Sequence, residues 1–234
     1  MDLSPDWTVY SRVGAMPINA TLVSTWIVMA LLSVGSWLVT RRLVLDAPVS
    51  RWQNVVEVLV DGAARQIAGV VHRPAAEFLP FLGTLFLFIL TCNVLSVVPG
   101  FQPPTGSLST TSALAIVVLL AVPVWGIKEV GLRAYFRRYV EPSVLMLPMN
   151  IIGEISRTIA LSVRLFGNVM SGTIIAGILL ALTPLIVPVA VQLLGLVTGV
   201  IQAYVFTLLA AVFIGAAIGA HEDRVRSGSE ASTS

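Results

Sequence analysis

The sequence predicts an all-α polytopic membrane protein with five membrane helices and one amphipathic surface helix, in which the last two membrane helices are long and tilted. Of the 234 residues, 56% are hydrophobic and only 11% are charged, whereas a soluble domain carries about 25% charged residues. The mean hydropathy is +0.92. Several apolar runs reach the roughly 20 residues that a helix needs to cross about 30 Å of hydrocarbon. We therefore expect residues 1–234 to form a single membrane domain.

The first half of the chain predicts one span and one surface helix. The apolar run 18–40 is expected to be the first span, and Arg41 and Arg42 end it. Residues 1–17 lack the positive start and short apolar run of a cleavable signal peptide, so this span is expected to be retained. In 47–72, apolar residues recur at helical spacing and charged residues share the opposite side. This pattern predicts an amphipathic helix on the membrane surface or against a partner, and it fits an ordinary amphipathic connector equally well.

The remaining apolar runs predict four further spans. The second is expected at 77–98 and the third at 108–127, followed by a basic loop. The fourth and fifth are expected at 142–182 and 185–220, before a polar tail at 221–234 that is expected to be disordered. Helices of this length measure roughly 50–60 Å, nearly twice the hydrocarbon thickness. Because the prolines lie near their ends, we expect two unbroken, strongly tilted helices.

The basic residues predict the orientation of the chain. Of the 14 lysines and arginines, five lie between spans one and two, four lie after span three, and two lie in the tail. Only Arg12 lies on the opposite side, and two more fall within span four. The positive-inside rule therefore places the N-terminus outside and the C-terminus in the cytoplasm, in agreement with an odd number of spans. The net charge of +2 is too small to indicate a nucleic-acid partner.

The most informative stretch is 150–171, which is apolar but carries charges. If it is helical, its polar and charged residues fall on one stripe, formed by Asn150, Glu154, Arg157, Arg164, Asn168 and Ser171. A charge at membrane depth costs roughly 2.5–3.5 kcal/mol, so such residues indicate function by default. Glu154 and Arg157 stand three residues apart and can pair within the helix. Snorkelling of Arg157 to the interface is the structural alternative.

Arg164 has no acidic partner in either long helix. It follows Glu154 by ten residues, or about 15 Å, and 185–220 contains no acid. An arginine cannot discharge by losing its proton. We therefore expect Arg164 to face water or a carboxylate of another subunit.

The last span also carries a small, polar stripe, formed by Gln192, Gly195, Gly199 and Gln202. Close helix packing is the simplest interpretation of the glycines, whereas Gln202 is a candidate for a wet face. The sequence has no P-loop, dinucleotide glycine motif, nucleophile–base arrangement or metal-ligand cluster. The chain is therefore not expected to hydrolyse ATP by itself or to hold a metal or cofactor. Its single cysteine, Cys92, is expected to be a buried, inert thiol.

Several segments resemble, in the same order, those of subunit a of the F-type ATP synthase, the stator subunit of the membrane Fo sector. The signature-like stretch is LSVRLFGNVMSG, supported by FLGTLFLFILTCNVLSVVPG, PTGSLSTTSALA, GIKEVG, PMNIIGEISR and GLVTGVIQAYVFTLLAAVFIG. The resemblance covers roughly 50–220. It implies an outer helix, a surface helix, a membrane hairpin and two long tilted helices that curve around the c-ring.

The resemblance also implies roles for individual residues. Arg164 matches the family's essential arginine, which separates two ion half-channels. Asn168, Glu154 and Gln202 match three further family positions, and Arg157 lies among them. The sequence departs from the family at two positions: Thr173 stands where many members have glutamate, and Gly195 where some have histidine or an acid. Water, Thr173 and Gln202 are then expected to line that half-channel, which is compatible with sodium coupling or with a divergent, alternate-type enzyme.

The implied function is coupling of H+ or Na+ flow to rotation, without catalysis by this chain alone. The implied partners are the lipid bilayer, the b-subunit stator stalk and the c-ring, the rotor proteolipid that carries the ion-binding carboxylate. The implied location is the bacterial cytoplasmic (inner) membrane. Two alternatives stay open, a self-contained secondary ion transporter and a non-transporting membrane scaffold. Co-purification with an oligomeric small proteolipid would separate both from the first hypothesis.

Overall fold

The computed structural model describes residues 9–13, 16–41, 51–98, 101–132, 135, 146–182 and 186–219. The tail that was expected to be disordered, most of the basic loop and the join between the last two helices lie outside these ranges. Two short strands, β1 (Val9–Val13) and β2 (Met16–Asn19), pair antiparallel. The all-α expectation did not include this pair, because strands of this length give no sustained alternation in the sequence.

Among the described residues, the rest of the fold is helical. Its six α-helices are α1 (Ala20–Thr40), α2 (Arg51–Val71), α3 (Leu79–Leu95), α4 (Leu108–Val130), α6 (Met146–Leu182) and α7 (Ile186–Gly219). Short 3-10 helices, η2 (Ala75–Glu77) and η3 (Pro104–Gly106), precede α3 and α4. Four helices, α1, α4, α6 and α7, are long and apolar enough to cross a membrane, and α3 is a shorter apolar helix. The chain is therefore a polytopic helical membrane protein.

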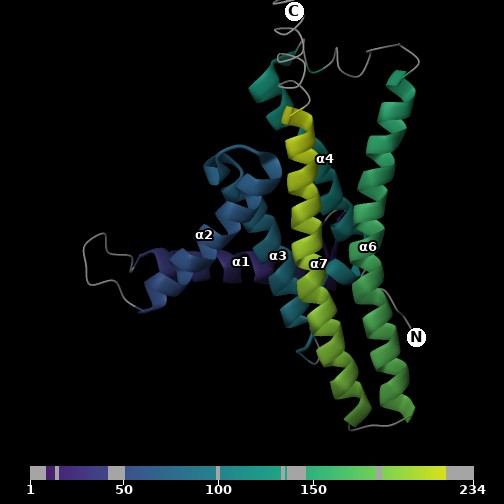
Figure 1. The fold of residues 1–234 in the computed structure, drawn as a ribbon. Helices are drawn as coiled ribbons and strands as arrows, with labels where there is room; N and C mark the ends of the chain where they lie inside the picture. The colour runs from purple at the N-terminus through teal and green to yellow at the C-terminus, as the bar shows by residue number, and fades with distance from the viewer. Residues whose placement is uncertain are drawn as a thin grey trace, which may run out of the picture.

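The two longest helices dominate the structure. Figure 1 shows α6 and α7 side by side and antiparallel, with α1 and α2 running at an angle to them. α6 has 37 residues and α7 has 34, which corresponds to roughly 55 and 51 Å. Pro148 and Pro188 lie in the first turns of these helices, where a missing N–H breaks no intrahelical hydrogen bond. Both helices consequently continue without a break.

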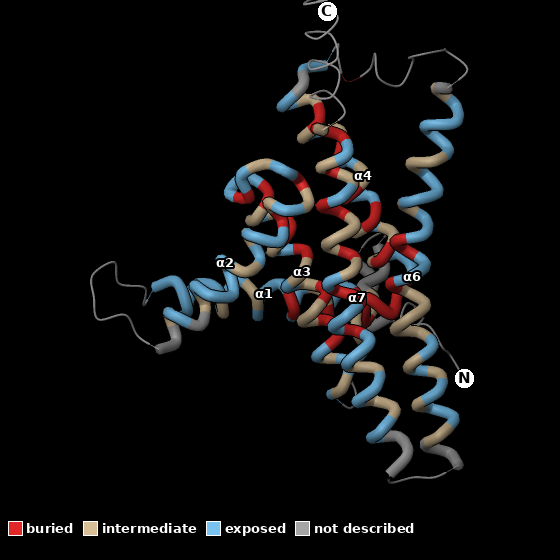
Figure 2. Tube along the Cα trace, in the orientation of Figure 1, coloured by how far each residue is buried: buried red, intermediate tan, exposed pale blue. Residues whose placement is uncertain are grey.

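The core lies where α3, α4, α6 and α7 meet. Figure 2 shows the buried segments gathered in this region. The C-terminal end of α6 and the N-terminal end of α7 carry exposed and half-buried residues instead. The largest fully buried side chains of the core include Leu82, Ile89, Leu165, Phe206 and Ile214. Because the surrounding hydrocarbon is as apolar as these side chains, van der Waals packing rather than water exclusion holds the helices together.

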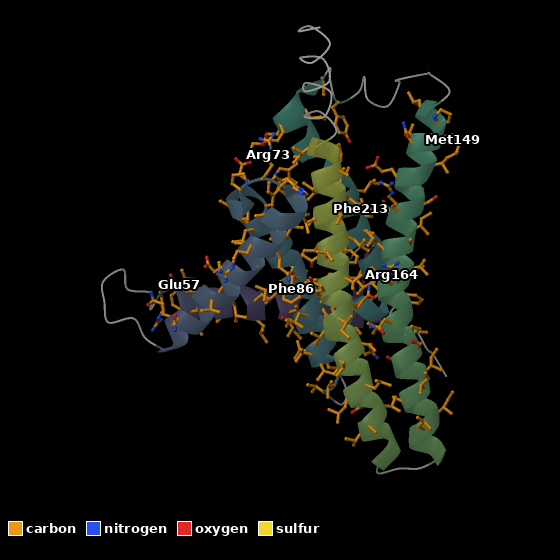
Figure 3. All side chains as sticks on the ribbon, in the orientation of Figure 1. Glu57, Arg73, Phe86, Met149, Arg164 and Phe213 are labelled. Atoms are coloured by element: carbon orange, nitrogen blue, oxygen red, sulfur yellow. The ribbon has the colours of Figure 1, made fainter. Side chains whose placement is uncertain are left out.

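Ion pairs connect the helices at one end of the bundle. Lys128 Nζ lies 3.1 Å from Glu77 Oε2, and Arg73 Nη1 lies 3.8 Å from Glu129 Oε2. Both pairs join the residues before α3 to the last turn of α4. Gly131, with φ +86°, then ends α4 in a conformation that favours glycine. Figure 3 shows Arg73 toward the same end of the molecule as the start of α6.

The amphipathic α2 packs on α7 with one face. Ile67 and Val71 are buried, whereas Asp61 and Arg65 form an exposed pair on the other side. The hydroxyl of Tyr204 donates a 2.7 Å hydrogen bond to Gln66 Oε1. These contacts give α2 a defined position against the bundle.

Candidate functional site

Arg164 lies about halfway along α6, as Figure 3 shows. Its side chain is exposed, although the neighbouring Leu161 and Leu165 are buried in the core. Within the described ranges, no side-chain hydrogen bond or ion pair reaches Arg164. The rigid core therefore holds a fixed positive charge at the surface of the helix bundle.

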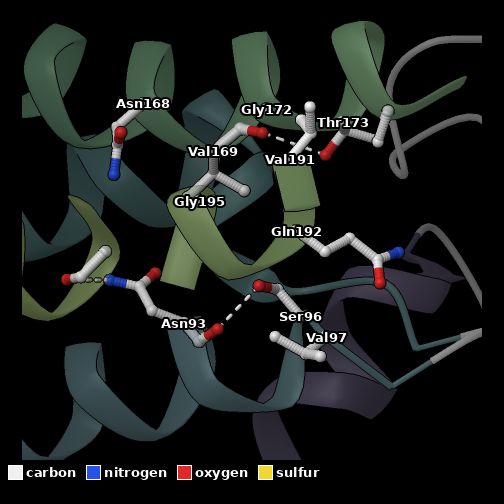
Figure 4. Close-up of a pocket in the computed structure, with 12 residues that line it drawn as sticks. Asn93, Ser96, Val97, Asn168, Val169, Gly172, Thr173, Val191, Gln192 and Gly195 are labelled. Atoms are coloured by element: carbon white, nitrogen blue, oxygen red, sulfur yellow. Dashed lines mark hydrogen bonds between the residues drawn. The ribbon is translucent and has the colours of Figure 1, made fainter. Parts of the chain in front are cut away.

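A polar cavity lies between α6 and α7, on the C-terminal side of Arg164 along α6. Figure 4 shows the residues that line it. Its polar and glycine lining comes from α6, α7 and the end of α3, and consists of Asn168, Gly172, Thr173, Gln192, Gly195, Gly199, Asn93 and Ser96. We name it the Thr173 cavity. Its volume of about 130 Å³ has room for several waters, each of which occupies about 30 Å³ in the liquid. None of the described residues that line it is charged, so hydroxyl, amide and backbone groups are the hydrogen-bonding partners that these residues offer.

The two predicted residues Thr173 and Gly195 meet in this cavity. The Thr173 hydroxyl donates to the Val169 carbonyl one turn earlier, at 2.9 Å, and its oxygen still has a free lone pair for a water. An ideal Cβ at Gly195 would have no atom within 4 Å. The absence of a side chain at Gly195 therefore leaves open space, unlike the close packing proposed for this stripe.

Asn93 and Ser96 line the same cavity, and the sequence analysis missed both. Asn93 Nδ2 donates a 2.7 Å hydrogen bond to the Gly199 carbonyl, while Asn93 Oδ1 accepts one of 3.3 Å from Thr105 Oγ1. Ser96 Oγ donates to the Asn93 carbonyl at 2.6 Å. Asn93 could have been found from the sequence, because it stands inside an apolar run and an amide at membrane depth requires hydrogen-bonding partners.

A second polar cavity lies on the other side of Arg164, nearer the start of α6. Glu154, Arg157 and Thr158 contribute its polar wall, and α4 and α7 close it with Val118, Leu119, Val122, Phe213, Ala216 and Ala217. We name it the Glu154 cavity, and its volume is about 50 Å³. Both charged residues of the predicted stripe that precede Arg164 therefore share one cavity.

The helical spacing permits Glu154 and Arg157 to pair, and the structure shows a contact of Arg157 with the other long helix. The Arg157 guanidinium carbon lies 5.4 Å from the ring centroid of Phe213 on α7, within the range of a cation–π interaction. Among the described residues, Arg157 forms no ion pair. The helical spacing permits the pair with Glu154, but an aromatic face on the neighbouring helix competes for the guanidinium.

Gln202 lies at about the same height as Arg164. Arg164 is 18 residues before the end of α6 and Gln202 is 16 residues after the start of α7, or about 27 and 24 Å from the join. Gln202 is only 9% exposed, and its Nε2 has no hydrogen-bond partner among the described residues. An unsatisfied buried amide costs about 1–3 kcal/mol, so this nitrogen is a candidate to bind water or another subunit.

The structure thus divides the predicted residues into three levels. Asn168, Thr173 and Gly195 line the Thr173 cavity, and Glu154 and Arg157 line the Glu154 cavity. Arg164 and Gln202 lie between these levels. From Glu154 to Thr173 is 19 residues, or about 29 Å along the helix, which matches the hydrocarbon thickness.

No cluster of three or more His, Cys, Asp or Glu that could hold a metal occurs in the described ranges. Cys92 is buried, as predicted.

Known proteins resemble this chain over most of its length. The model of the family described as ATP synthase A chain matches residues 22–215. ATP synthase subunit a 2 of Acaryochloris marina is 54% identical over 232 residues, covering 99% of each chain. ATP synthase subunit a of Albidiferax ferrireducens is 55% identical over 217 residues, covering 93% of this chain and 94% of the relative. ATP synthase subunit a 1 of Chlorobaculum parvum is 53% identical over 222 residues, covering 95% and 98%. With a family match over residues 22–215 and relatives more than 50% identical over nearly the whole chain, the chain belongs to the ATP synthase subunit a family.

Proposed function

We propose that this chain conducts ions through the Fo sector by two separate half-channels, with Arg164 as the charge that keeps them apart. As a subunit a, it is an ion-translocating stator component of a rotary ATP synthase and not a catalyst on its own. The observation that carries the proposal is the position of Arg164. It lies between two polar cavities, and no described side chain neutralises it.

The two cavities are the proposed cores of the half-channels. Both contain polar groups at a depth where the surrounding helix faces are apolar, and a polar cavity at membrane depth favours water. They lie at opposite ends of a segment about as long as the membrane is thick. Because Arg164 lies between the cavities, an ion that enters one cavity needs a carrier that reaches the other by a different route.

We propose that a carboxylate on a neighbouring rotor helix is this carrier. The exposed face of α6 around Arg164 is apolar and includes Ile155, Ile159 and Val163, which is suited to contact with another helix inside the bilayer. The rotor carboxylate would take up an ion at one cavity and travel around the ring, away from Arg164, in its neutral, ion-bound form. It would release the ion at the other cavity and then pass Arg164 ionised, because the guanidinium favours the ionised form.

Arg164 must attract this carboxylate without trapping it. In a dry, isolated pair the Coulomb attraction would far exceed thermal energy. Exposure of Arg164 and the adjacent Thr173 cavity support a hydrated contact, in which the attraction is weaker. A membrane potential supplies about 2.3 kcal/mol per charge per 100 mV, so several ions are needed for each ATP.

The proposed setting is a multi-pass protein of the bacterial inner membrane with five spans, the amphipathic α2 at the surface, an outside N-terminus and a cytoplasmic C-terminus. The basic residues support this orientation, and they put the Glu154 cavity on the cytoplasmic side and the Thr173 cavity on the outer side. The proposed protein partners are the c-ring and the b-subunit stalk. Their binding would hold α6 against the rotor and prevent the stator from turning with it.

The test is Arg164→Ala in the complete ATP synthase, reconstituted into liposomes. We expect ion-driven ATP synthesis to fall below detection while the amount of assembled complex stays the same. Ala160→Ser is a matched control on the same exposed face of α6, and it should leave synthesis within about twofold of the wild type, as expected for a surface substitution. Unchanged synthesis in Arg164→Ala would refute the proposal.

The transported ion is identified by a separate measurement. In the complete enzyme, a carbodiimide reagent modifies the protonated rotor carboxyl group, and a bound sodium ion prevents this modification. Protection by sodium at constant pH would assign Na+ as the coupling ion, whereas loss of reactivity with rising pH and no sodium effect would assign H+.

A further inference from the structure

Three hydroxyl side chains join α4 to α6 close to Arg164. Ser162 Oγ on α6 lies 3.1 Å from Ser112 Oγ on α4 and donates a 3.4 Å hydrogen bond to Thr111 Oγ1, also on α4. We name these three residues the hydroxyl cluster. We infer that the hydroxyl cluster fixes the rotation of α6 about its own axis, and that Ser162 is thereby a positioning residue for Arg164. The inference rests on the proposed role of Arg164.

The hydrogen bonds of the hydroxyl cluster run in one direction. The Thr111 hydroxyl donates within α4, to the carbonyls of Ser107 and Leu108 at 3.2 and 3.1 Å. Toward Ser162, the Thr111 oxygen is therefore an acceptor. Because the Ser162 hydrogen is used in that bond, the Ser112 hydroxyl donates to Ser162. All three hydroxyl hydrogens thus have an acceptor, and the last acceptors belong to the backbone of α4.

Burial turns these hydrogen bonds into a constraint on α6. Thr111 is fully buried and Ser162 is only 5% exposed, at a depth where a hydroxyl requires a partner. The other buried side chains around Ser162 on α6 are Leu161 and Leu165. Apolar packing of this kind tolerates a small rotation, whereas a hydrogen bond weakens as its distance and angle change. The hydroxyl cluster therefore favours one rotational setting of α6.

The rotational setting of α6 determines where Arg164 stands. Two residues along an α-helix correspond to a rotation of about 200°, so Ser162 and Arg164 leave α6 on nearly opposite sides. Accordingly, Ser162 is buried and Arg164 is exposed. A rotation of α6 by about 20° would move a group at the helix surface, roughly 5–6 Å from the axis, by about 2 Å. The bonds on one side of α6 thus set the position of the guanidinium on the other.

The start of α4 is itself fastened to the rest of the bundle. Thr105 in η3, directly before α4, is fully buried and donates a 3.3 Å hydrogen bond to Asn93 Oδ1 on α3. Asn93 in turn donates to the Gly199 carbonyl on α7. Because α3 and α7 both hold this end of α4, α4 is a fixed reference against which Ser162 sets α6.

The test is Ser162→Ala in the complete ATP synthase in liposomes, with every rate divided by the amount of assembled complex. We expect ATP synthesis at a fixed membrane potential to fall about threefold to tenfold, the range for loss of an interhelical hydrogen bond. A carbodiimide reagent, added without sodium, then blocks the rotor carboxyl groups, and a voltage-sensitive dye reports the remaining charge leak. This leak should rise, because a displaced Arg164 separates the two cavities less well.

A second background shows whether Ser162 acts through Arg164. In Arg164→Ala the charge that Ser162 positions is absent, so adding Ser162→Ala should raise the leak no further. A further rise in that background, or lower synthesis with an unchanged leak in Ser162→Ala alone, would overturn the inference in favour of general packing.

Two matched variants test the hydrogen bond itself. Ser112→Ala removes the donor to Ser162, and combining it with Ser162→Ala should lower synthesis no more than Ser162→Ala alone. Thr207→Val removes a half-buried hydroxyl that donates at 2.9 Å to the Ala203 carbonyl of its own helix, α7. It should leave synthesis and leak within about twofold of the wild type. Additive losses in the double variant, or an equal loss in Thr207→Val, would contradict positioning by the hydroxyl cluster.

The outcomes also distinguish this inference from the proposed function. Unchanged synthesis and leak in Ser162→Ala, together with abolished synthesis in Arg164→Ala, would reject the role of Ser162 and leave the half-channels intact. Unchanged synthesis in Arg164→Ala would reject the proposed function and this inference with it.

Discussion

Asn93 and Gly199 fasten α3 to α7 at the edge of the Thr173 cavity. The Asn93 amide donates to the Gly199 carbonyl at 2.7 Å, and a Cβ built on Gly199 would lie 3.0 Å from Asn93 Cβ. Real Cβ atoms rarely come this close, so glycine permits the approach that the hydrogen bond needs. The cavity wall and the helix contact thus depend on the same two residues.

Gly199→Ala is expected to destabilise the assembled subunit by about 1–3 kcal/mol, the usual cost of overpacking. Asn93 must move away, so its bond to the carbonyl should weaken and ion flux should fall. Thermal stability and flux of the purified enzyme measure the two effects. Gly69→Ala in α2, where an added Cβ meets no atom within 4 Å, is the control, and an equal effect there would contradict the explanation.

Gln202→Met should separate stability from activity. It removes a buried Nε2 that has no described partner, and relief of an unsatisfied amide is worth about 1–3 kcal/mol. We expect the thermal stability of the complete enzyme to stay constant or rise while ATP synthesis declines. If stability and synthesis fall together, the amide has a structural partner in the assembled complex.

Thr173→Glu should place a titratable charge in the Thr173 cavity, where the described lining residues carry none. Above the pKa of the new carboxylate, the negative charge is present and attracts the entering cation, and below that pKa the effect disappears. We expect cation flux to rise up to about tenfold at low ionic strength and to lose this gain with added salt. Thr173→Gln, which has a similar size and no charge, should show neither response to pH nor response to salt.

The ion pair of Lys128 with Glu77 should contribute little to stability. Its nitrogen and oxygen are 3.1 Å apart, but the two side chains are 61% and 51% exposed, so water screens the attraction. Glu77→Gln is expected to cost less than about 1 kcal/mol and to leave ion flux unchanged. A loss well above this value, measured by thermal unfolding of the complex, would show that assembly with other subunits buries the pair.

Sequence reasoning succeeded where the residues of a single segment were enough to predict its structure. The unbroken α6 could be predicted from an apolar run of suitable length, since Pro148 stands near its start. The importance of Arg164 stays a prediction, made by counting the acids in the two long helices.

Sequence reasoning failed where two distant segments compete for one group. The spacing of Glu154 and Arg157 favours a pair, and nothing near them indicates that Phe213 lies opposite. Gly195 and Gly199 look alike in the sequence, yet one borders open space and the other touches Asn93. Only the packing of α3 and α7 distinguishes them.

The distribution of buried residues along α6 and α7 has a mechanical consequence. None of the described residues from Ser171 to Leu179, or from Val189 to Thr198, is buried, so the two helices extend past the core as a two-membered arm. Arg164 is at the root of this arm, next to the fully buried Leu165. Like a cantilever fixed at its root, such an arm is displaced most at its far end and least at its root. A load from a passing rotor would therefore shift the far ends of the two helices, while the guanidinium keeps its place.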